Sequence, residues 1–344
     1  MKKKNILVFG ASGFIGTYLI EELFNQNYQI IASDNNSIGR EYFKKKSIPY
    51  INIDITNKKE FENIPKNKYD VVIILAALQP ATFDINKNKV QDYFQTNVIG
   101  TLHILDFCRN NKVGKVIYAC SHRNTSGLWQ KNKAIKEIDG RAQRFNDEYA
   151  MFSLSESAAQ DCLEYYSIQF GLKNIIFRLP PVYGYGPHLE IFKNGKPVKT
   201  GFQTFIENAI DCKPLKIWGD SERGRDIIYV KDVVSAFLKA IVNIKAEGLY
   251  NISSGKYLTL KEEVETIAKV FWCDSSKPVI IEQPEKALLM DSFLYDNSKA
   301  KRELDWAPQY NFEDMLMDYQ KEKESNKFNF LIEKRKKMFQ ITKQ

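Results

Sequence analysis

Residues 5–16, Asn-Ile-Leu-Val-Phe-Gly-Ala-Ser-Gly-Phe-Ile-Gly, constrain the fold of this chain more than any other stretch. Residues 6–9 are predicted to form a short buried strand, and a helix is expected over residues 17–25. The three glycines between and beside them suit a tight turn, a pyrophosphate approaching the helix N-terminus, and close packing of helix on sheet. Glycines at this spacing can also mark a structural turn, but the strand before and the helix after favour a dinucleotide. We therefore predict a cofactor cradle formed by Gly10, Ser12, Gly13, Phe14, Ile15 and Gly16.

Short apolar runs alternate with helical patterns through the first half of the chain. Strands are expected at residues 6–9, 29–33, 50–53, 71–76, 116–119 and 174–178, and helices at 17–25, 41–46, 58–63, 90–110 and 149–170. Strands that are apolar on both faces and separated by helices are typical of a doubly wound parallel sheet. We therefore expect an α/β Rossmann domain with a smaller C-terminal substrate lobe.

The domain boundaries follow from breaks in this pattern. A dinucleotide-binding domain is predicted over residues 1–179, and residues 217–245 are expected to return to it. The substrate lobe is predicted over residues 180–320, with helices near 202–209, 230–244, 260–270 and 312–320. The highly charged residues 321–344 are expected to form an exposed helix or a frayed tail.

Composition limits the class of protein. The hydrophobic content of 44% and charged content of 27% are ordinary for a soluble protein, and the apolar run at residues 71–78 is too short to span a membrane. Because the chain passes from Met1 and three lysines directly into the first predicted strand, we expect no signal peptide. Five cysteines without a Cys-x2-Cys pair favour free thiols in a reducing cytoplasm and argue against a metal site. The net charge of +8 is spread along the chain without a basic, aromatic face, so no nucleic-acid partner is expected.

A carboxylate follows the second expected strand at the place where a dinucleotide's ribose would lie. Asp34, with Asn35 beside it, comes about 20 residues after the glycines, where a carboxylate accepts hydrogen bonds from the adenosine ribose hydroxyls. A carboxylate there repels a 2′-phosphate, so NAD is favoured over NADP, although Arg40 lies nearby. The alternative is that Asp34 only caps the strand end. Asp54 and Ile55 are expected to hold the adenine edge, and Ala76 and Ala77 to let the backbone lie against the cofactor.

Eight short motifs in order resemble the extended short-chain dehydrogenase/reductase family, the nucleotide-sugar epimerases and dehydratases. They are Gly10-Ala-Ser-Gly-Phe-Ile-Gly16, Asp34-Asn35, Asp54-Ile55, Leu75-Ala-Ala77, Asn97-Val-Ile-Gly-Thr101, Arg178-Leu-Pro-Pro-Val-Tyr-Gly184, the run from Gly219 to Asp232, and Tyr250-Asn-Ile-Ser-Ser-Gly255. The resemblance covers residues 5–320. It implies an NAD cofactor, a nucleotide-sugar ligand, and a homodimer formed through the helices expected at 90–110 and 149–170.

The resemblance also assigns roles to residues outside the glycine run. It places Asn97 beside the cofactor and gives Arg225 a nucleotide diphosphate to hold. The alternative for Arg225 is a salt bridge with Asp226 or Asp232. Pro181 stands where the family usually has an asparagine before Val-Tyr-Gly, which removes a side-chain donor to the substrate.

The family's chemistry uses a tyrosine base and a lysine four residues later, which lowers the pKa of the tyrosine. Aligned on the downstream part of the expected helix, these positions fall on Phe152 and Glu156. In a second register Tyr149 is the base and Ser153 takes the place of the lysine. Neither register supplies a lysine. The family's Ser or Thr falls on His122, with Ser121 one residue before it.

Three interpretations of this departure remain open at the level of sequence. In the first interpretation, the chain binds NAD and a nucleotide sugar without turnover, and the Glu156 carboxylate accepts hydrogen bonds from ribose hydroxyls. Alternatively, His122 is a rebuilt general base that Glu156 orients, unless it is simply a loop histidine. In the third, Tyr149 is the base and borrows a cation from elsewhere, for instance Lys131 or Lys133. We expect an NAD-dependent enzyme with an atypical active site, or a catalytically silent binding protein.

Overall fold

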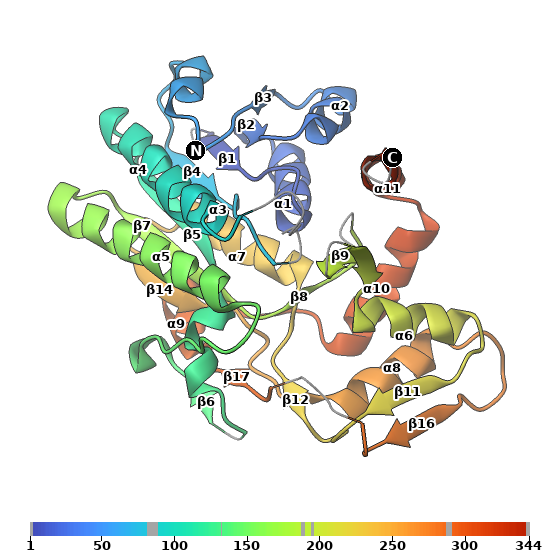
Figure 1. The fold of residues 1–344 in the computed structure, drawn as a ribbon. Helices are drawn as coiled ribbons and strands as arrows, with labels where there is room; N and C mark the ends of the chain where they lie inside the picture. The colour runs from blue at the N-terminus through green and yellow to red at the C-terminus, as the bar shows by residue number, and fades with distance from the viewer. Residues whose placement is uncertain are drawn as a thin grey trace.

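A seven-stranded, fully parallel sheet forms the centre of the computed structural model (Figure 1), which describes residues 3–80, 89–131, 133–186, 190–193, 196–286 and 291–341. Its strand order is β14-β7-β5-β4-β1-β2-β3. The strands are β1 (Asn5–Phe9), β2 (Gln29–Asp34), β3 (Tyr50–Asn52), β4 (Val71–Ile74), β5 (Lys115–Ser121), β7 (Asn174–Leu179) and β14 (Gly248–Asn251). The doubly wound fold is therefore confirmed. The edge strand β14 was not expected, because it follows the sixth strand only after a long excursion into the second half of the chain.

Alternation along β1 builds a separate core on each face of the sheet. Ile6 and Val8 point to one face and pack with α1 (Phe14–Asn25) and α7 (Val230–Val242). Leu7 and Phe9 point to the other face and pack with α4 (Thr101–Asn110) and α5 (Ala150–Phe170). All four of these β1 side chains are fully buried, which is why the strand reads as a continuous apolar run.

Two of the expected helices have a different geometry. The segment η1 (Lys58–Asn63) is a 3-10 helix. The helix expected over residues 90–110 is interrupted: α3 (Asp92–Phe94) leads into a π-helical turn, η2 (Gln95–Gly100), and then into α4. The π turn holds Asn97, whose side chain bonds the backbone N–H and carbonyl of Leu78 and the hydroxyl of Ser155. Turns of this kind often lie at functional sites.

The second half of the chain adds smaller sheets and a group of helices. Strands β11 (Leu215–Trp218) and β16 (Ile280–Gln283) pair in parallel. The other pairs are β8 (Val182–Tyr183) with β13 (Ile228–Tyr229), β12 (Gly224–Arg225) with β15 (Leu258–Thr259), β6 (Ala134–Ile135) with β17 (Leu294–Tyr295), and β9 (Glu190–Lys193) with β10 (Lys196–Lys199). Further α-helices are α2 (Ser37–Lys45), α6 (Gly201–Ile210), α8 (Leu260–Phe271), α9 (Ser298–Leu304) and α10 (Phe312–Glu324), and η3 (His122–Leu128) and η4 (Glu137–Asp139) are 3-10 helices.

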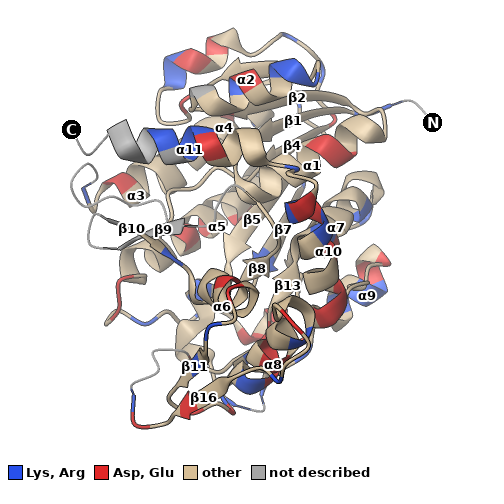
Figure 2. Ribbon diagram, turned by 90° about the vertical axis from the view of Figure 1, so that its right-hand side faces the viewer, with Lys and Arg blue, Asp and Glu red and all other residues tan. Residues whose placement is uncertain are grey.

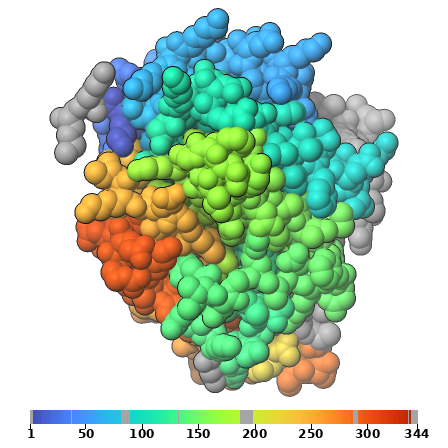
Figure 3. Space-filling model, turned by 90° about the vertical axis from the view of Figure 1, so that its left-hand side faces the viewer, coloured from blue at the N-terminus to red at the C-terminus, as the bar shows by residue number. Residues whose placement is uncertain are grey.

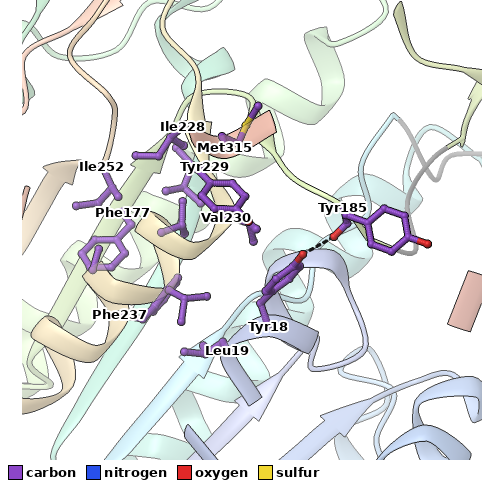
Figure 4. Close-up of a cluster of buried hydrophobic side chains, with 14 of the residues drawn as sticks. Tyr18, Leu19, Phe177, Tyr185, Ile228, Tyr229, Val230, Phe237, Ile252 and Met315 are labelled. Carbon is purple, nitrogen blue, oxygen red and sulfur yellow. Dashed lines mark hydrogen bonds between the residues drawn. The ribbon is translucent and has the colours of Figure 1, made fainter. Parts of the chain in front are cut away.

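Aromatic side chains join the two halves around α1 (Figure 4). Tyr18, on α1, donates a hydrogen bond from its hydroxyl to the carbonyl oxygen of Tyr185, and both rings belong to the larger of the two cores. Phe177, Phe237 and Met315 belong to the same core. The two halves therefore share one hydrophobic core on this face of the sheet.

The C-terminal segment corrects the expectation of an exposed or frayed tail. It forms a helix, α11 (Asn329–Ile341), but one face of that helix and the residue before it are buried. Phe328 is 0% exposed and its ring lies 5.0 Å from that of Tyr18, centre to centre. Charged residues are frequent along this segment (Figure 2), so its composition alone gives no sign of the buried side chains.

The cysteines correct a second expectation. Cys212 and Cys273 form a disulfide, whereas Cys108, Cys120 and Cys162 are free. The two bonded residues are 61 positions apart and meet because α6 and α8, which precede them, pack side by side. The spacing of cysteines along the sequence does not indicate which of them meet in the fold. Among the described residues, no helix combines the length and apolar character that a membrane span requires.

Candidate active site

A cleft of about 850 Å³ opens at the carboxyl ends of β1, β2, β4, β5 and β7. This is the edge of an open α/β sheet where ligands bind, because the loops that follow parallel strands meet there. Most of the predicted site residues line this cleft: Gly10, Ser12, Gly13, Phe14, Ile15, Gly16, Asp34, Asn35, Asp54, Ile55, Ala76, Ala77, Ser121, His122, Tyr149, Glu156 and Pro181. Asn97 and Arg225 are not among them.

Two of the three glycines, Gly10 and Gly16, leave room that no other residue would leave. Gly10 has a φ of +81°, and a Cβ on it would lie 2.5 Å from the backbone nitrogen of Ala76. A Cβ on Gly16 would overlap the carbonyl oxygen of Gly10. Gly13 is the residue before α1, so the first backbone N–H groups of the helix face the cleft. This bare cradle at a helix N-terminus fits the pyrophosphate of a dinucleotide.

Asp34 is held rigidly at the end of β2. Its carboxylate accepts hydrogen bonds from the backbone N–H of Ser12 and of Asn35 and from the side-chain amide of Asn36. Burial raises the pKa of Asp34 above its usual value, and these hydrogen bonds oppose the rise. The carboxylate is therefore fixed beside the glycine turn, and its contact with ribose hydroxyls stays a prediction.

The walls of the cleft come from the next two strands. Asp54 accepts hydrogen bonds from the backbone N–H and the hydroxyl of Thr56, which also lines the cleft. The backbone of Ala76 lies against Gly10, so close that a Cβ on Gly10 would overlap it. Asn97 acts indirectly, because its side chain bonds the backbone of Leu78 and Leu78 lines the cleft. A direct contact from Asn97 to the cofactor stays a prediction.

His122 is buried in an aromatic pocket beside the cleft. It is 8% exposed, and its ring stacks on Trp129 at 5.4 Å and lies 5.1 Å from Phe293, between ring centres. Its Nδ1 lies 3.1 Å from the carbonyl oxygen of Leu179, so Nδ1 carries the proton and Nε2 is unprotonated. Burial and the nearby charge of Arg123 lower the pKa of His122 well below its usual value. The imidazole is therefore neutral, and Leu179 rather than Glu156 fixes its orientation.

Glu156 is a buried carboxyl group on the cleft-facing side of α5. It is 2% exposed. Burial raises the pKa of Glu156 to about 7, and the neighbouring Tyr118 hydroxyl and Ser121 backbone oppose the rise. Its Oε1 has no hydrogen-bond partner among the described residues. Phe152, one turn earlier, also lines the cleft and contacts the ring of Tyr93.

Tyr149 meets a cation that the sequence analysis missed. The guanidinium carbon of Arg123 lies 3.7 Å from the centre of the Tyr149 ring, and both residues line the cleft. Burial raises the pKa of Tyr149, while Arg123 and Arg225 lower it. Arg123 directly follows His122 at the end of β5. Its position after a central strand is the sequence feature from which its place in the cleft could have been predicted. Lys131 and Lys133, named from the sequence, are not among the lining residues.

Arg225 lies behind the cleft and pairs with residues other than those expected. Its guanidinium donates a hydrogen bond to the Tyr183 hydroxyl and lies 3.7 Å from the Glu263 carboxylate. The alternative salt bridges with Asp226 or Asp232 are wrong, because both carboxylates accept hydrogen bonds from backbone N–H groups instead. Pro181 lines the cleft and uses its carbonyl oxygen to accept the N–H of Ile228. A phosphate contact for Arg225 and a substrate contact for Pro181 stay predictions.

Comparison with known proteins places this geometry in a family. Residues 6–253 match the family model described as "NAD dependent epimerase/dehydratase family". A dTDP-glucose 4,6-dehydratase of Haemophilus influenzae is 27% identical over 334 residues, which cover 91% of this chain and 95% of that protein. A UDP-N-acetyl-alpha-D-glucosaminuronate decarboxylase of Bacillus cytotoxicus is 30% identical over 273 residues, covering 77% of this chain and 79% of that protein.

Solved structures agree at the level of the fold. The UDP-glucose 4-epimerase of Thermotoga maritima, solved with UDP-glucose, has a TM-score of 0.76 at 24% identity and covers 93% of this chain and 99% of its own. The family match spans most of the chain and includes the glycine cradle, Asp34 and the cleft-lining ends of β4, β5 and β7. The chain therefore belongs to the NAD-dependent epimerase/dehydratase family, whose relatives act on nucleotide sugars, and NAD is its cofactor.

Proposed function

We propose that this protein is an NAD-dependent enzyme that oxidises a carbon of a nucleotide sugar by hydride transfer, as the first step of an epimerisation or dehydration. The observation that carries the proposal is the position of Arg123 against Tyr149 inside the cleft that holds the glycine cradle. NAD supplies the nicotinamide that accepts the hydride, and the glycines with Asp34 would hold its adenosine and pyrophosphate.

Tyr149 is the base in this proposal. Its phenolate oxygen takes the proton of a sugar hydroxyl as the carbon–hydrogen bond breaks and the carbonyl forms. A general base works best when its pKa lies near the working pH, and burial alone would hold the pKa of Tyr149 too high. Burial outweighs the charges in this structure, so the pKa of Tyr149 stays above its usual value, but the positive charges of Arg123 and Arg225 oppose the rise. We assign to these charges the electrostatic task of the family's lysine.

His122 is less suited to the same task. Its Nε2 would have to accept a proton inside an aromatic pocket, and the charges of Arg123, Arg225 and Arg178 all disfavour an imidazolium there. A neutral His122 can still accept a hydrogen bond from a sugar hydroxyl through Nε2. We therefore assign it to substrate positioning, and Ser121 to a hydrogen bond with the substrate or with Tyr149.

A catalytically silent protein that binds NAD and a nucleotide sugar is the second candidate. One observation favours it: no lysine is among the residues that line the described cleft, and the Glu156 carboxyl is buried on the same wall. Glu156 with a pKa near 7 would accept hydrogen bonds from ribose hydroxyls in its ionised form without promoting hydride transfer.

Turnover of a panel of nucleotide sugars separates the two candidates. Purified protein is incubated with NAD and each sugar, and nicotinamide absorbance and product sugars are followed. We expect Tyr149→Phe to lower kcat about 10²- to 10⁴-fold, the range that a general base contributes. Arg123→Gln is expected to shift the pH profile of kcat upward and Arg123→Lys to restore it in part. Loss of turnover in His122→Gln, with Tyr149→Phe active, would contradict the assignment, and binding without turnover would favour the silent protein.

We also propose a cytoplasmic homodimer. The support is an apolar surface on α5, where Tyr165, Ile168 and Phe170 are 55%, 79% and 43% exposed. This helix packs beside α4, and the two lie on the face shown in Figure 3, residues 101–110 in teal and 150–170 in green. A group of exposed apolar side chains on one helix is typical of an association surface. Sedimentation of the protein as a monomer at micromolar concentration would rule the dimer out.

A further inference from the structure

The C-terminal helix α11 is fixed against the first two helices of the sheet domain (Figure 2). The Phe330 ring stacks on Tyr42 of α2 with 6.4 Å between ring centres, and the Nζ of Lys334 lies 3.0 Å from the Glu41 carboxylate. Phe328 packs on Tyr18 of α1. Phe328 lies just before the start of α11, and Phe330 and Lys334 lie after it. These contacts therefore fix the position of the helical turn that carries Arg335.

That next turn carries Arg335 into the cofactor cleft. Residues 328, 331, 332 and 335 follow the helical spacing of a single face. The first three, Phe328, Leu331 and Ile332, are buried. Arg335 continues the same face and lines the cleft together with Asp34, Asn35 and Asn36. Among the described side chains of α11, Arg335 is the one that lines the end of the cleft where the adenosine of NAD would lie.

The charge of Arg335 complements this end of the cleft. Burial lowers the pKa of Arg335 to about 10, and the attraction of the Asp34 carboxylate opposes the fall, so the guanidinium stays positive at neutral pH. A planar guanidinium stacks on aromatic faces and donates several hydrogen bonds at once. Arg335 and Asp34 thus present a planar donor group and an acceptor group to the same space.

We propose that Arg335 is a cofactor-binding residue, which closes the end of the cleft that Asp34 lines and so contacts the adenosine half of NAD. The guanidinium contacts the adenosine half of NAD, and α11 serves to carry it there. A purely structural pairing of Arg335 with Asp34 would have the opposite effect, because it would occupy the carboxylate that the ribose needs. The proposal rests on cofactor binding alone and is independent of the chemistry assigned to Tyr149.

Calorimetric titration of the full-length protein with NAD and with ADP-ribose tests the proposal in the absence of sugar. We expect Arg335→Ala to weaken both ligands about 10-fold and to the same degree, because both carry the adenosine half. Lys334→Ala is the matched control: it removes the ion pair with Glu41 in the same turn, and we expect less than a 2-fold change. Thermal melting without ligand reports whether each variant is folded.

Three outcomes would overturn the proposal. Unchanged or tighter NAD binding by Arg335→Ala would identify a structural pair with Asp34. An equal loss in Lys334→Ala would show that docking of α11, and not the guanidinium, is what matters. If Arg335→Ala weakens the binding of NAD but not that of ADP-ribose, the effect lies at the nicotinamide half of the cofactor.

Discussion

The two ends of the cleft differ in the kind of atoms that form them: backbone atoms at one end and side chains at the other. At the cofactor end, the shape comes from backbone atoms: the glycine turn leaves space, and Asp34 is held by the N–H groups of Ser12 and Asn35. At the other end, the groups that face the cleft are side chains from separate elements, namely Ser121, His122 and Arg123 after β5 and Tyr149 and Glu156 at α5. A backbone cradle keeps its form when neighbouring side chains change. A side-chain cluster can lose its lysine and acquire an arginine while the fold is retained.

The largest effect is expected from a substitution in the glycine turn at the cofactor end of the cleft. Gly10→Ala places a Cβ against the backbone of Ala76 at a φ of +81°, and we expect a loss of about 2–5 kcal/mol in the free energy of unfolding, together with loss of NAD binding. Gly171→Ala is the control, because its φ is +66° but no atom lies within 4 Å of the added Cβ. We expect a loss of about 1–2 kcal/mol there. Denaturant unfolding of both variants measures the difference, and equal losses would refute crowding at Gly10.

A smaller effect, of opposite sign, is expected at the side-chain end. The pKa of Glu156 is about 7 in the folded protein and near 4.5 when unfolded, so the folded state binds the proton more tightly. Its contribution to stability is therefore lost as pH rises from about 4.5 to 7, by about 3 kcal/mol in all. Glu156→Gln keeps the shape without the charge and should be more stable than wild type at pH 8 and equal to it at pH 4.

The pH dependence of unfolding identifies this effect. Asp226 is also buried with a pKa of about 7 and contributes a slope in the same window, so Glu156→Gln should flatten the pH dependence without abolishing it. An unchanged slope would mean that Glu156 is ionised in the folded protein throughout, which would favour its role as an acceptor for ribose hydroxyls.

The smallest expected effect concerns the choice between NAD and NADP at the cofactor end of the cleft. Asp34→Asn removes the charge that repels a 2′-phosphate, and we expect the affinity for NADP relative to NAD to rise about 10-fold. Asp54→Asn is the control, since Asp54 also lines the cleft but is engaged with Thr56. Competition binding of the two cofactors gives the ratio, and the same rise in Asp54→Asn would discount any specific role of Asp34.

The features that could be predicted from sequence are those that depend on neighbouring residues. The first six strands of the sheet follow from local spacing and alternation, and the structure confirms them. The glycine turn and Asp34 were placed by the same local spacing, and they line the cleft, while their contacts with a cofactor stay predictions. Strand β14, the disulfide and the approach of Arg123 to Tyr149 require segments far apart in the chain to meet. Arg335 was hidden for a further reason, because charged residues dominate its helix and composition says nothing of which one faces inward.

The late return of the chain to its first half has a consequence for how the protein is made. Strand β7 has no neighbour on its outer side until β14 is synthesised, and α1 and α2 lack the cover of α11 until the last residues appear. A nascent chain that has just completed β7 therefore carries an open, apolar sheet edge. Domains that depend on late segments in this way stay exposed to aggregation throughout translation. For this protein, C-terminal truncation should harm the yield of folded molecules even where it removes no residue of the sheet.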